Sequence, residues 1–292
     1  MTMAVIRGAE LHYELIGDRG AWIALSPGGR RGFQELRPLA NLLAAAGYRV
    51  LLHDRRNCGR TSVSFVDDAS EFMVWADDLY ELLRHLKIER AIVGGFSSGC
   101  RMSLLLAGKH PEIVTALLLM RVTGGRFAAR RLAHKYYTAY IDLARQAGMA
   151  AVAADPHYAA AIAADPRNRD VLLGMPAGRF IEIMERWRDS LEAGADMPAL
   201  GITADDLRRL DMPTCVIPGN DATHPMEVGR AVAGLLSNGT LLEPGLAQQD
   251  AEFIDMEAWC DHRTLAQVLI DYLKHHARQA NPAEACRPVA GQ

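Results

Sequence analysis

Ser97 stands in the turn of residues 95–99, Gly-Phe-Ser-Ser-Gly, which is the segment of the chain best suited to covalent chemistry. The turn follows an apolar run at 91–93, typical of a buried strand, and precedes a helix predicted at 98–109. A serine on such a sharp turn projects its hydroxyl into a cleft, and the flanking glycines avoid collisions with the neighbouring strand and helix. The start of the helix directs NH groups toward negative charge that develops on an attacked carbonyl. The pattern predicts a nucleophilic serine; a glycine-rich turn with an inert serine is the alternative.

Strand-like and helix-like segments alternate through the first 121 residues. Short apolar runs predict buried strands, and amphipathic segments between them predict helices. The strand-like runs lie at 22–25, 48–52, 91–93 and 114–120. Strands that are apolar throughout and alternate with helices indicate a mostly parallel sheet with helices on both faces. We therefore expect an α/β fold with a central sheet of about eight strands.

The alternation stops between residues 122 and 205, where helical patterns follow one another without a convincing strand. It resumes with an apolar run at 214–217. We therefore expect an α/β core formed by residues 1–121 and 206–277, with residues 122–205 inserted as an all-helical cap. Such a cap would cover the carboxyl ends of the strands, where ligands of open α/β sheets bind. Residues 278–292 are expected to form a disordered tail.

The order of these motifs resembles that of the α/β-hydrolase superfamily, in particular its capped serine hydrolases of the esterase and carbon–carbon bond hydrolase type. Residues 25–29, Leu-Ser-Pro-Gly-Gly, stand where the family has its oxyanion loop, and residues 54–62 resemble its D-x-R-G-x-G-x-S turn. The resemblance covers nearly the whole chain. It implies a serine hydrolase that cleaves an ester, thioester, lactone, amide or carbon–carbon ketone bond through Ser97. The oxyanion donors would be the backbone NH groups of Ser98 and of Gly29 or Arg30.

The same resemblance implies that Asp221 is the acid partner of a catalytic histidine. Asp221 follows the strand predicted at 214–217, where the family has its acid. A buried carboxylate there would hold a histidine in the correct tautomer and stabilise its charged form. The other candidate segment, after the strand that ends at Met120, carries Arg121 and no acid. An Asx-turn before Pro225 is the structural alternative for Asp221.

Two histidines are candidates for the base. The family carries this histidine in the loop after the last strand, but residues 243–250 contain none. His262 is the nearest histidine beyond that loop, and we expect it to be the base if the last helix begins at about residue 263. His224 is the alternative; it lies three residues after Asp221, a short tether for a side chain that must also reach Ser97. Without a base Ser97 would be a poor nucleophile, and a lyase, a cyclase or a non-catalytic binding protein would fit better.

Arginines gather on the segments that the resemblance brings to the cleft. They are Arg30, Arg31, Arg55, Arg56, Arg60, Arg121, Arg126, Arg130 and Arg131. A guanidinium binds a carboxylate or a phosphate through two parallel hydrogen bonds. Arg30 and Arg121 are the two that we expect to bind a carboxylate of the substrate. For each arginine, solvation or pairing with a nearby aspartate is the alternative.

Composition excludes several function classes. The chain has 292 residues and a net charge of −3, so no basic field attracts nucleic acid or an anionic membrane. No stretch approaches the about 18–20 apolar residues that span a bilayer, and the first residues lack an apolar segment of signal-peptide length. The five cysteines are odd in number and lack metal-ligand spacing, which favours a reduced cytoplasmic location. We expect a small-molecule substrate and no metal or cofactor, and a homodimer is left open.

Overall fold

The central element of the fold is an eight-stranded sheet with the strand order β1-β2-β4-β3-β5-β6-β7-β8. The computed structural model describes residues 2–66, 68 and 70–280 of the chain. β1 pairs with β2, and β2 with β4, in antiparallel fashion, and the pairings from β4 to β8 are parallel. The strands are β1 (Thr2–Ile6), β2 (Ala9–Ile16), β3 (Trp22–Ser26), β4 (Arg49–His53), β5 (Ala91–Phe96), β6 (Val114–Met120), β7 (Thr214–Ile217) and β8 (Gly239–Leu241).

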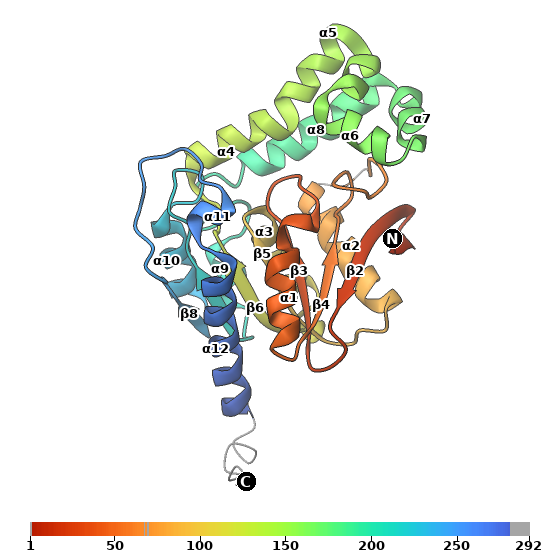
Figure 1. Cartoon of the computed structure of the whole chain (residues 1–292). Helices are drawn as coiled ribbons and strands as arrows, with labels where there is room; N and C mark the ends of the chain where they lie inside the picture. Colours follow the sequence, from red (N-terminus) through yellow and green to blue (C-terminus); the bar gives the residue numbers. More distant parts are fainter. Residues whose placement is uncertain (1, 67, 69, 281–292) are drawn as a thin grey trace.

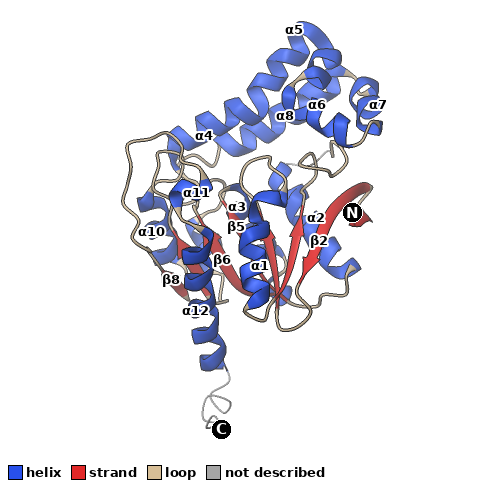
Figure 2. Cartoon of the chain, viewed as in Figure 1, coloured by secondary structure: helices blue, strands red, loops and turns tan. Residues whose placement is uncertain are grey.

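Helices cover both faces of the sheet, which explains why the parallel strands are apolar throughout. Ile23 and Leu25 of β3 pack with α1 and α12 on one face, while Ala24 belongs to the core on the opposite face, with α2, α3 and α10. The layers are visible in Figure 2. The helices are α1 (Arg37–Ala45), α2 (Glu71–His85), α3 (Ser98–Lys109), α10 (Met226–Leu235), the short α11 (Met256–Trp259) and α12 (His262–Ala280).

A block of helices follows β6 and lies across one end of the sheet, above the loops that leave the parallel strands (Figure 1). The block consists of α4 (Gly125–Ala133), the π-helical turn η3 (His134–Thr138), α5 (Ala139–Ala154), α6 (Pro156–Ala164), α7 (Arg167–Gly174) and α8 (Ala177–Glu192). A short helix, α9 (Ala204–Arg208), leads back to β7. Phe65, from the loop after β4, packs against Phe180 and Trp187 of α8. Aromatic packing therefore joins this block to the sheet layer.

The predicted fold class is confirmed, with eight strands and helices on both faces of the sheet. The helices of the predicted cap segment, residues 122–205, occur between β6 and β7. The end of the chain differs from the expectation of a disordered tail at 278–292. α12 continues to Ala280, three residues into that segment, and residues 281–292 lie outside the described residues.

Candidate active site

Ser97 occupies a strained turn between β5 and α3. Its backbone has φ 53° and ψ −111°, in the region that favours glycine, and its NH donates a hydrogen bond to the carbonyl of Met120 at 3.0 Å. A Cβ on Gly95 would approach the carbonyl oxygen of Ser26 to 2.7 Å, and one on Gly99 would approach it to 2.5 Å. Glycine at both positions therefore lets β3 and α3 lie close to the turn, as the sequence pattern requires.

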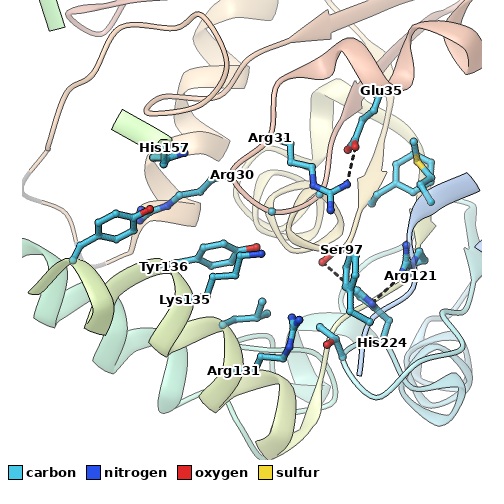
Figure 3. A pocket seen from close by; sticks show the side chains of 18 residues that line it. Arg30, Arg31, Glu35, Ser97, Arg121, Arg131, Lys135, Tyr136, His157 and His224 are labelled. Carbon is cyan, nitrogen blue, oxygen red and sulfur yellow. Dashed lines mark hydrogen bonds and ion pairs between the residues drawn. The ribbon is translucent and has the colours of Figure 1, made fainter. Parts of the chain in front are cut away.

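A continuous chain of hydrogen bonds runs from Ser97 to a buried carboxylate. Ser97 Oγ lies 2.9 Å from His224 Nε2 (Figure 3), and His224 Nδ1 lies 2.9 Å from Asp221 Oδ1. The side chain of Thr123, after β6, also contacts the serine, with 3.0 Å between the two hydroxyl oxygens. His224 and Asp221 are buried, with exposed fractions of 1% and 0%. The arrangement presents an imidazole that can remove the proton of a serine hydroxyl.

The loop after β7 folds tightly enough to place the acid and the base in contact. The NH of His224 donates to the carbonyl of Asp221 at 3.1 Å and to Asp221 Oδ1 at 2.8 Å. A Cβ on Gly219 would lie 2.2 Å from the Cβ of His224, so the turn depends on a glycine there. The three-residue tether therefore closes a compact turn and leaves the imidazole directed at Ser97.

The second oxygen of Asp221 is also bound. Oδ2 accepts a hydrogen bond from the NH of Ile254 at 2.9 Å and from the guanidinium of Arg121 at 2.6 Å. Burial opposes ionisation of Asp221, but the hydrogen bond and charge of His224, the Ile254 NH and Arg121 outweigh it and hold the pKa of Asp221 well below its usual range. Burial lowers the pKa of His224, and the charge of Arg121 lowers it further, against the hydrogen bond to Asp221. Asp221 is therefore ionised and His224 neutral near pH 7, which suits a base.

Arg55 holds the predicted oxyanion loop through hydrogen bonds to its backbone. Its guanidinium donates to the carbonyls of Gly28 and Gly29 and, at 2.8 Å, to the hydroxyl of Ser98. That hydroxyl in turn donates to the carbonyl of Gly29 at 3.1 Å. These hydrogen bonds fix the carbonyl of Gly29, whose backbone has φ 53°. The loop at Gly29 is therefore held beside Ser97. Arg55 itself is buried and stacks on Trp75.

A cavity of about 220 Å³ opens in front of Ser97, between the sheet loops and the helical block. Ser97, His224 and the oxyanion loop line it from the sheet, and Arg131, Lys135 and Tyr136 line it from α4 and η3 (Figure 3). A second, much smaller cavity also reaches Ser97. Its lining is mostly apolar and includes Phe72, Val122, Leu132 and Leu200. A small molecule at Ser97 would therefore meet one polar and one apolar compartment.

Comparisons with known proteins agree with this geometry. A family model described as alpha/beta hydrolase fold matches residues 26–154, which include the turn at Ser97. The chain therefore has the α/β-hydrolase fold. This agrees with the predicted family; Asp221 and His224 lie beyond the matched residues.

Solved structures of similar fold include two named enzymes. An enol-lactonase from Burkholderia xenovorans LB400 superposes with a TM-score of 0.63 at 23% sequence identity, covering 94% of this chain and 100% of its own. A meta-cleavage product hydrolase from Pseudomonas fluorescens IP01 has a TM-score of 0.65 at 18% identity, covering 94% and 98%. At these identities the likeness concerns the fold.

A relative in sequence is the uncharacterized hydrolase YraK of Bacillus subtilis (strain 168), 32% identical over 113 residues. The alignment covers 39% of this chain and 41% of that relative, which is less than two thirds of its length. The hydrolase class predicted from the sequence is the class that this relative and the two solved structures carry in their names.

The structure brings His224, and not His262 as expected, into contact with Ser97 and Asp221. His262 is the first residue of α12, and in the described part of the chain its Nε2 has no hydrogen-bond partner. The segment between β8 and α11 instead runs along the Asp221–His224 turn: Ala222 and Thr223 donate their NH groups to the carbonyls of Ala251 and Glu252. Because this segment reaches Asp221 through its backbone, no histidine from it is needed to fill the site.

Arg30 and Arg121 line the cavity, but each is bound to a carboxylate of the protein. Arg30 pairs with buried Glu71 at 3.0 Å, and Tyr137 also donates to Glu71 at 3.0 Å. Burial disfavours the charge of Arg30, yet Glu71 and the surrounding tyrosines raise the pKa of Arg30 well above its usual value. Arg121 pairs with Asp221, as described above. Both arginines thus have roles inside the protein.

Three features of the site escaped the sequence analysis. Lys135 was overlooked because a lysine in a helical segment usually faces solvent, although its spacing of four residues from Arg131 places both on one face of a helix. Nothing in the sequence around Thr123 marks it as a contact of Ser97. Arg55 is one of the arginines expected at the cleft, and its place directly after Asp54, in the turn of residues 54–62, is the signal that sets it apart.

The described residues contain no group of three or more histidine, cysteine, aspartate or glutamate side chains that could hold a metal ion. None of their helices is long and apolar enough to cross a membrane.

Proposed function

We propose that this α/β-hydrolase is a serine hydrolase that cleaves an acyl bond of a small molecule through Ser97. The observation that carries the proposal is the hydrogen-bond chain Ser97–His224–Asp221, with 2.9 Å at both links. The strained backbone of Ser97 and the cavity in front of it support the same conclusion.

The chemistry begins with attack of Ser97 Oγ on the carbonyl carbon of the substrate. His224 Nε2 accepts the serine proton, while Asp221 keeps the proton on Nδ1 and stabilises the imidazolium that forms. Backbone NH groups of Ser98 and of Gly29 or Arg30 would bind the oxyanion of the tetrahedral intermediate. His224 then protonates the leaving group, and an acyl-enzyme remains on Ser97. A water molecule that gives its proton to His224 attacks this acyl group and releases the acid.

Ester, thioester, lactone, amide and carbon–carbon ketone bonds can all be cleaved by this sequence of steps. The two solved structures reported above are named as an enol-lactonase and a meta-cleavage product hydrolase. Those names make lactones and carbon–carbon bonds the first classes to test beside simple esters. The alternatives of a lyase, a cyclase or a non-catalytic binding protein depend on the lack of a usable histidine. The contact between His224 and Ser97 favours the hydrolase over them.

Labelling with a fluorophosphonate tests the proposal. Intact mass would be measured for wild type, Ser97→Ala and His224→Ala, with His262→Ala as the matched histidine control. We expect one adduct on wild type, none on Ser97→Ala, and labelling of His224→Ala slowed at least about 100-fold. His262→Ala should label at the wild-type rate.

Two results would contradict the assignment. Absence of an adduct on folded wild-type protein would remove the serine hydrolase. Slow labelling of His262→Ala together with normal labelling of His224→Ala would transfer the role of base to His262.

A further inference from the structure

Three cations line the cavity without matching negative charge. Arg31 follows the oxyanion loop, Arg131 belongs to α4 and Lys135 to η3, and all three border the same space as Ser97 (Figure 3). Among the described residues that line this cavity, Glu35 is the one acid. The cavity therefore carries an excess of positive charge even before its other arginines are counted.

The partners of these cations differ from those of the buried arginines. Arg31 binds Glu35 at 2.9 Å, but Arg131 reaches only Glu252, at 3.8 Å, and the side chain of Glu252 is 74% exposed. In the described part of the chain, no carboxylate lies within ion-pair distance of Lys135. An exposed pair at 3.8 Å contributes little binding energy. Arg131 and Lys135 are therefore available to an anion that enters the cavity.

The local structure holds the three charges together despite their repulsion. Arg131 and Lys135 are four residues apart, and the π-helical turn from His134 directs both Lys135 and Tyr136 to the cavity. The guanidinium groups of Arg31 and Arg131 each lie 5.6 Å from the centre of the Phe253 ring. Partial burial, and then the charges of Arg131 and Arg31, lower the pKa of Lys135. Like charges that share a small volume bind an anion more readily than separated ones do.

We propose that Arg31, Arg131 and Lys135 form a carboxylate-binding subsite, and that the enzyme acts on small acyl compounds that carry a carboxylate near the scissile bond. This inference rests on the proposed function of Ser97. The two arginines supply planar forks that match a carboxylate, and Lys135 adds a point charge. A cavity of about 220 Å³ restricts the substrate to a short one.

Matched pairs of chromogenic esters test the subsite. The first pair is mono-p-nitrophenyl glutarate and its methyl ester, which differ by one acyl-side charge. The second pair, 4-carboxyphenyl butyrate and its methyl ester, places the charge on the leaving group. We expect wild type to prefer the anionic member of one pair by about tenfold in kcat/KM, the low end for a charged hydrogen bond because the side chains are partly exposed. The preference should weaken as salt is added.

The double variant Arg131→Gln/Lys135→Gln should lose this preference, through an increase in KM for the anionic ester. Its kcat/KM should fall about tenfold more on the anionic ester than on the neutral ester. The control is Lys109→Gln/Arg208→Gln, which removes the same charge from two exposed ion pairs far from the cavity, with Asp77 and Asp205. The control should keep the wild-type preference, since only the net charge has changed.

The outcomes separate the subsite from the proposed function. Equal rates of wild type on both members of both pairs would overturn the subsite while leaving the hydrolase intact. Equal losses on anionic and neutral esters in the Arg131/Lys135 variant would overturn it too. If folded wild type cleaves none of the four esters and Ser97 takes no fluorophosphonate, the hydrolase fails, and the subsite fails with it.

Discussion

The charged side chains on the two sides of the cavity differ in burial and in ion pairing. On the sheet side, Asp221, Arg121, Glu71 and Arg30 are buried, and each has an oppositely charged partner within 3.0 Å. We call these the core-side charges. On the side of the helical block, Arg131 and Lys135 are the cap-side cations; Arg131 reaches only the exposed Glu252, at 3.8 Å, and no ion pair of Lys135 occurs among the described residues. Burial of a charge is costly without a partner, and the ion pairs offset this cost for the core-side charges.

This difference separates the part of the site that is fixed by contacts within the protein from the part that can bind a ligand. The core-side charges fix the catalytic groups: Arg121 and the NH of Ile254 hold Asp221, and Asp221 holds His224. Among the described contacts, the cap-side cations hold none of these groups in place. Catalytic geometry should therefore depend on the core side, and substrate choice on the cap side.

The largest expected effect follows from Asp221→Asn. An amide at this position can hold His224 in the wrong tautomer, and it leaves Arg121 buried without its carboxylate. We expect kcat/KM for a p-nitrophenyl ester to fall about 10³- to 10⁴-fold. Asp250→Asn, an exposed carboxylate nearby in the chain, is the control and should keep its activity. A loss below tenfold in Asp221→Asn would show that the acid is not needed and would weaken the distinction between the two sides of the cavity.

Glu71→Gln should have the next largest effect, on stability. It leaves Arg30 buried beside three tyrosine rings without a carboxylate. Removing one partner of a buried pair costs about 3–5 kcal/mol of the free energy of unfolding. Glu14→Gln breaks the exposed pair with Arg37 and should cost at most about 1 kcal/mol. Urea denaturation of both variants gives the comparison; similar values would mean that burial does not distinguish these pairs.

Arg121→Gln should shift the pH dependence of activity. Catalysis needs neutral His224, so kcat/KM falls as the pH drops through the pKa of this residue in the free enzyme. Burial and Arg121 both lower that pKa, so the acid limb of wild type should lie below the usual value of 6.5. Without the cation, protonation of His224 becomes easier and the acid limb should move to higher pH.

The pH profile of kcat/KM measures this shift, with Arg126→Gln as the control because Arg126 is exposed and pairs with Asp196. An acid limb that stays in place, or moves to lower pH, would show that Arg121 does not act on His224. A uniform loss of activity without a shift would make Arg121 a purely structural residue.

Much of the fold and two of the three residues of the proposed triad, Ser97 and Asp221, could be predicted because the responsible interactions are local. Gly95 and Gly99 mark the turn at Ser97 within five residues, and the close approaches to Ser26 explain why both must be glycine. Asp221 lies four residues after the end of the strand β7. The helical block is evident from the periodicity of residues 122–205. Each of these features is readable from neighbouring residues.

The contact of His224 with Ser97 could not be predicted because it depends on contacts between residues distant in the chain. His224 reaches Ser97 only if its turn closes, and closure needs Gly219 as well as the hydrogen bonds from Ala222 and Thr223 to residues 251 and 252. Nor does spacing reveal that Arg30 is taken by Glu71, 41 residues away. Pairing of charges is a property of the folded chain. The arginines that the sequence suggests for substrate binding, Arg30 and Arg121, are therefore not the cap-side cations, Arg131 and Lys135.

The smallest expected effect belongs to Lys135→Gln, measured as stability. Lys135 is repelled by Arg131 and Arg31, and no described carboxylate compensates, so its removal should leave the free energy of unfolding within about 1 kcal/mol of wild type.

Any increase in the stability of the variant over wild type should appear at neutral pH and low salt. Because the pKa of Lys135 is lower in the folded chain, wild type gains stability as the pH rises through that pKa, and the advantage of the variant should disappear there. A loss above about 2 kcal/mol would reveal a partner inside the protein. Lys135 would then behave like the core-side charges, and the contrast between the two sides of the cavity would no longer explain how this site selects its substrate.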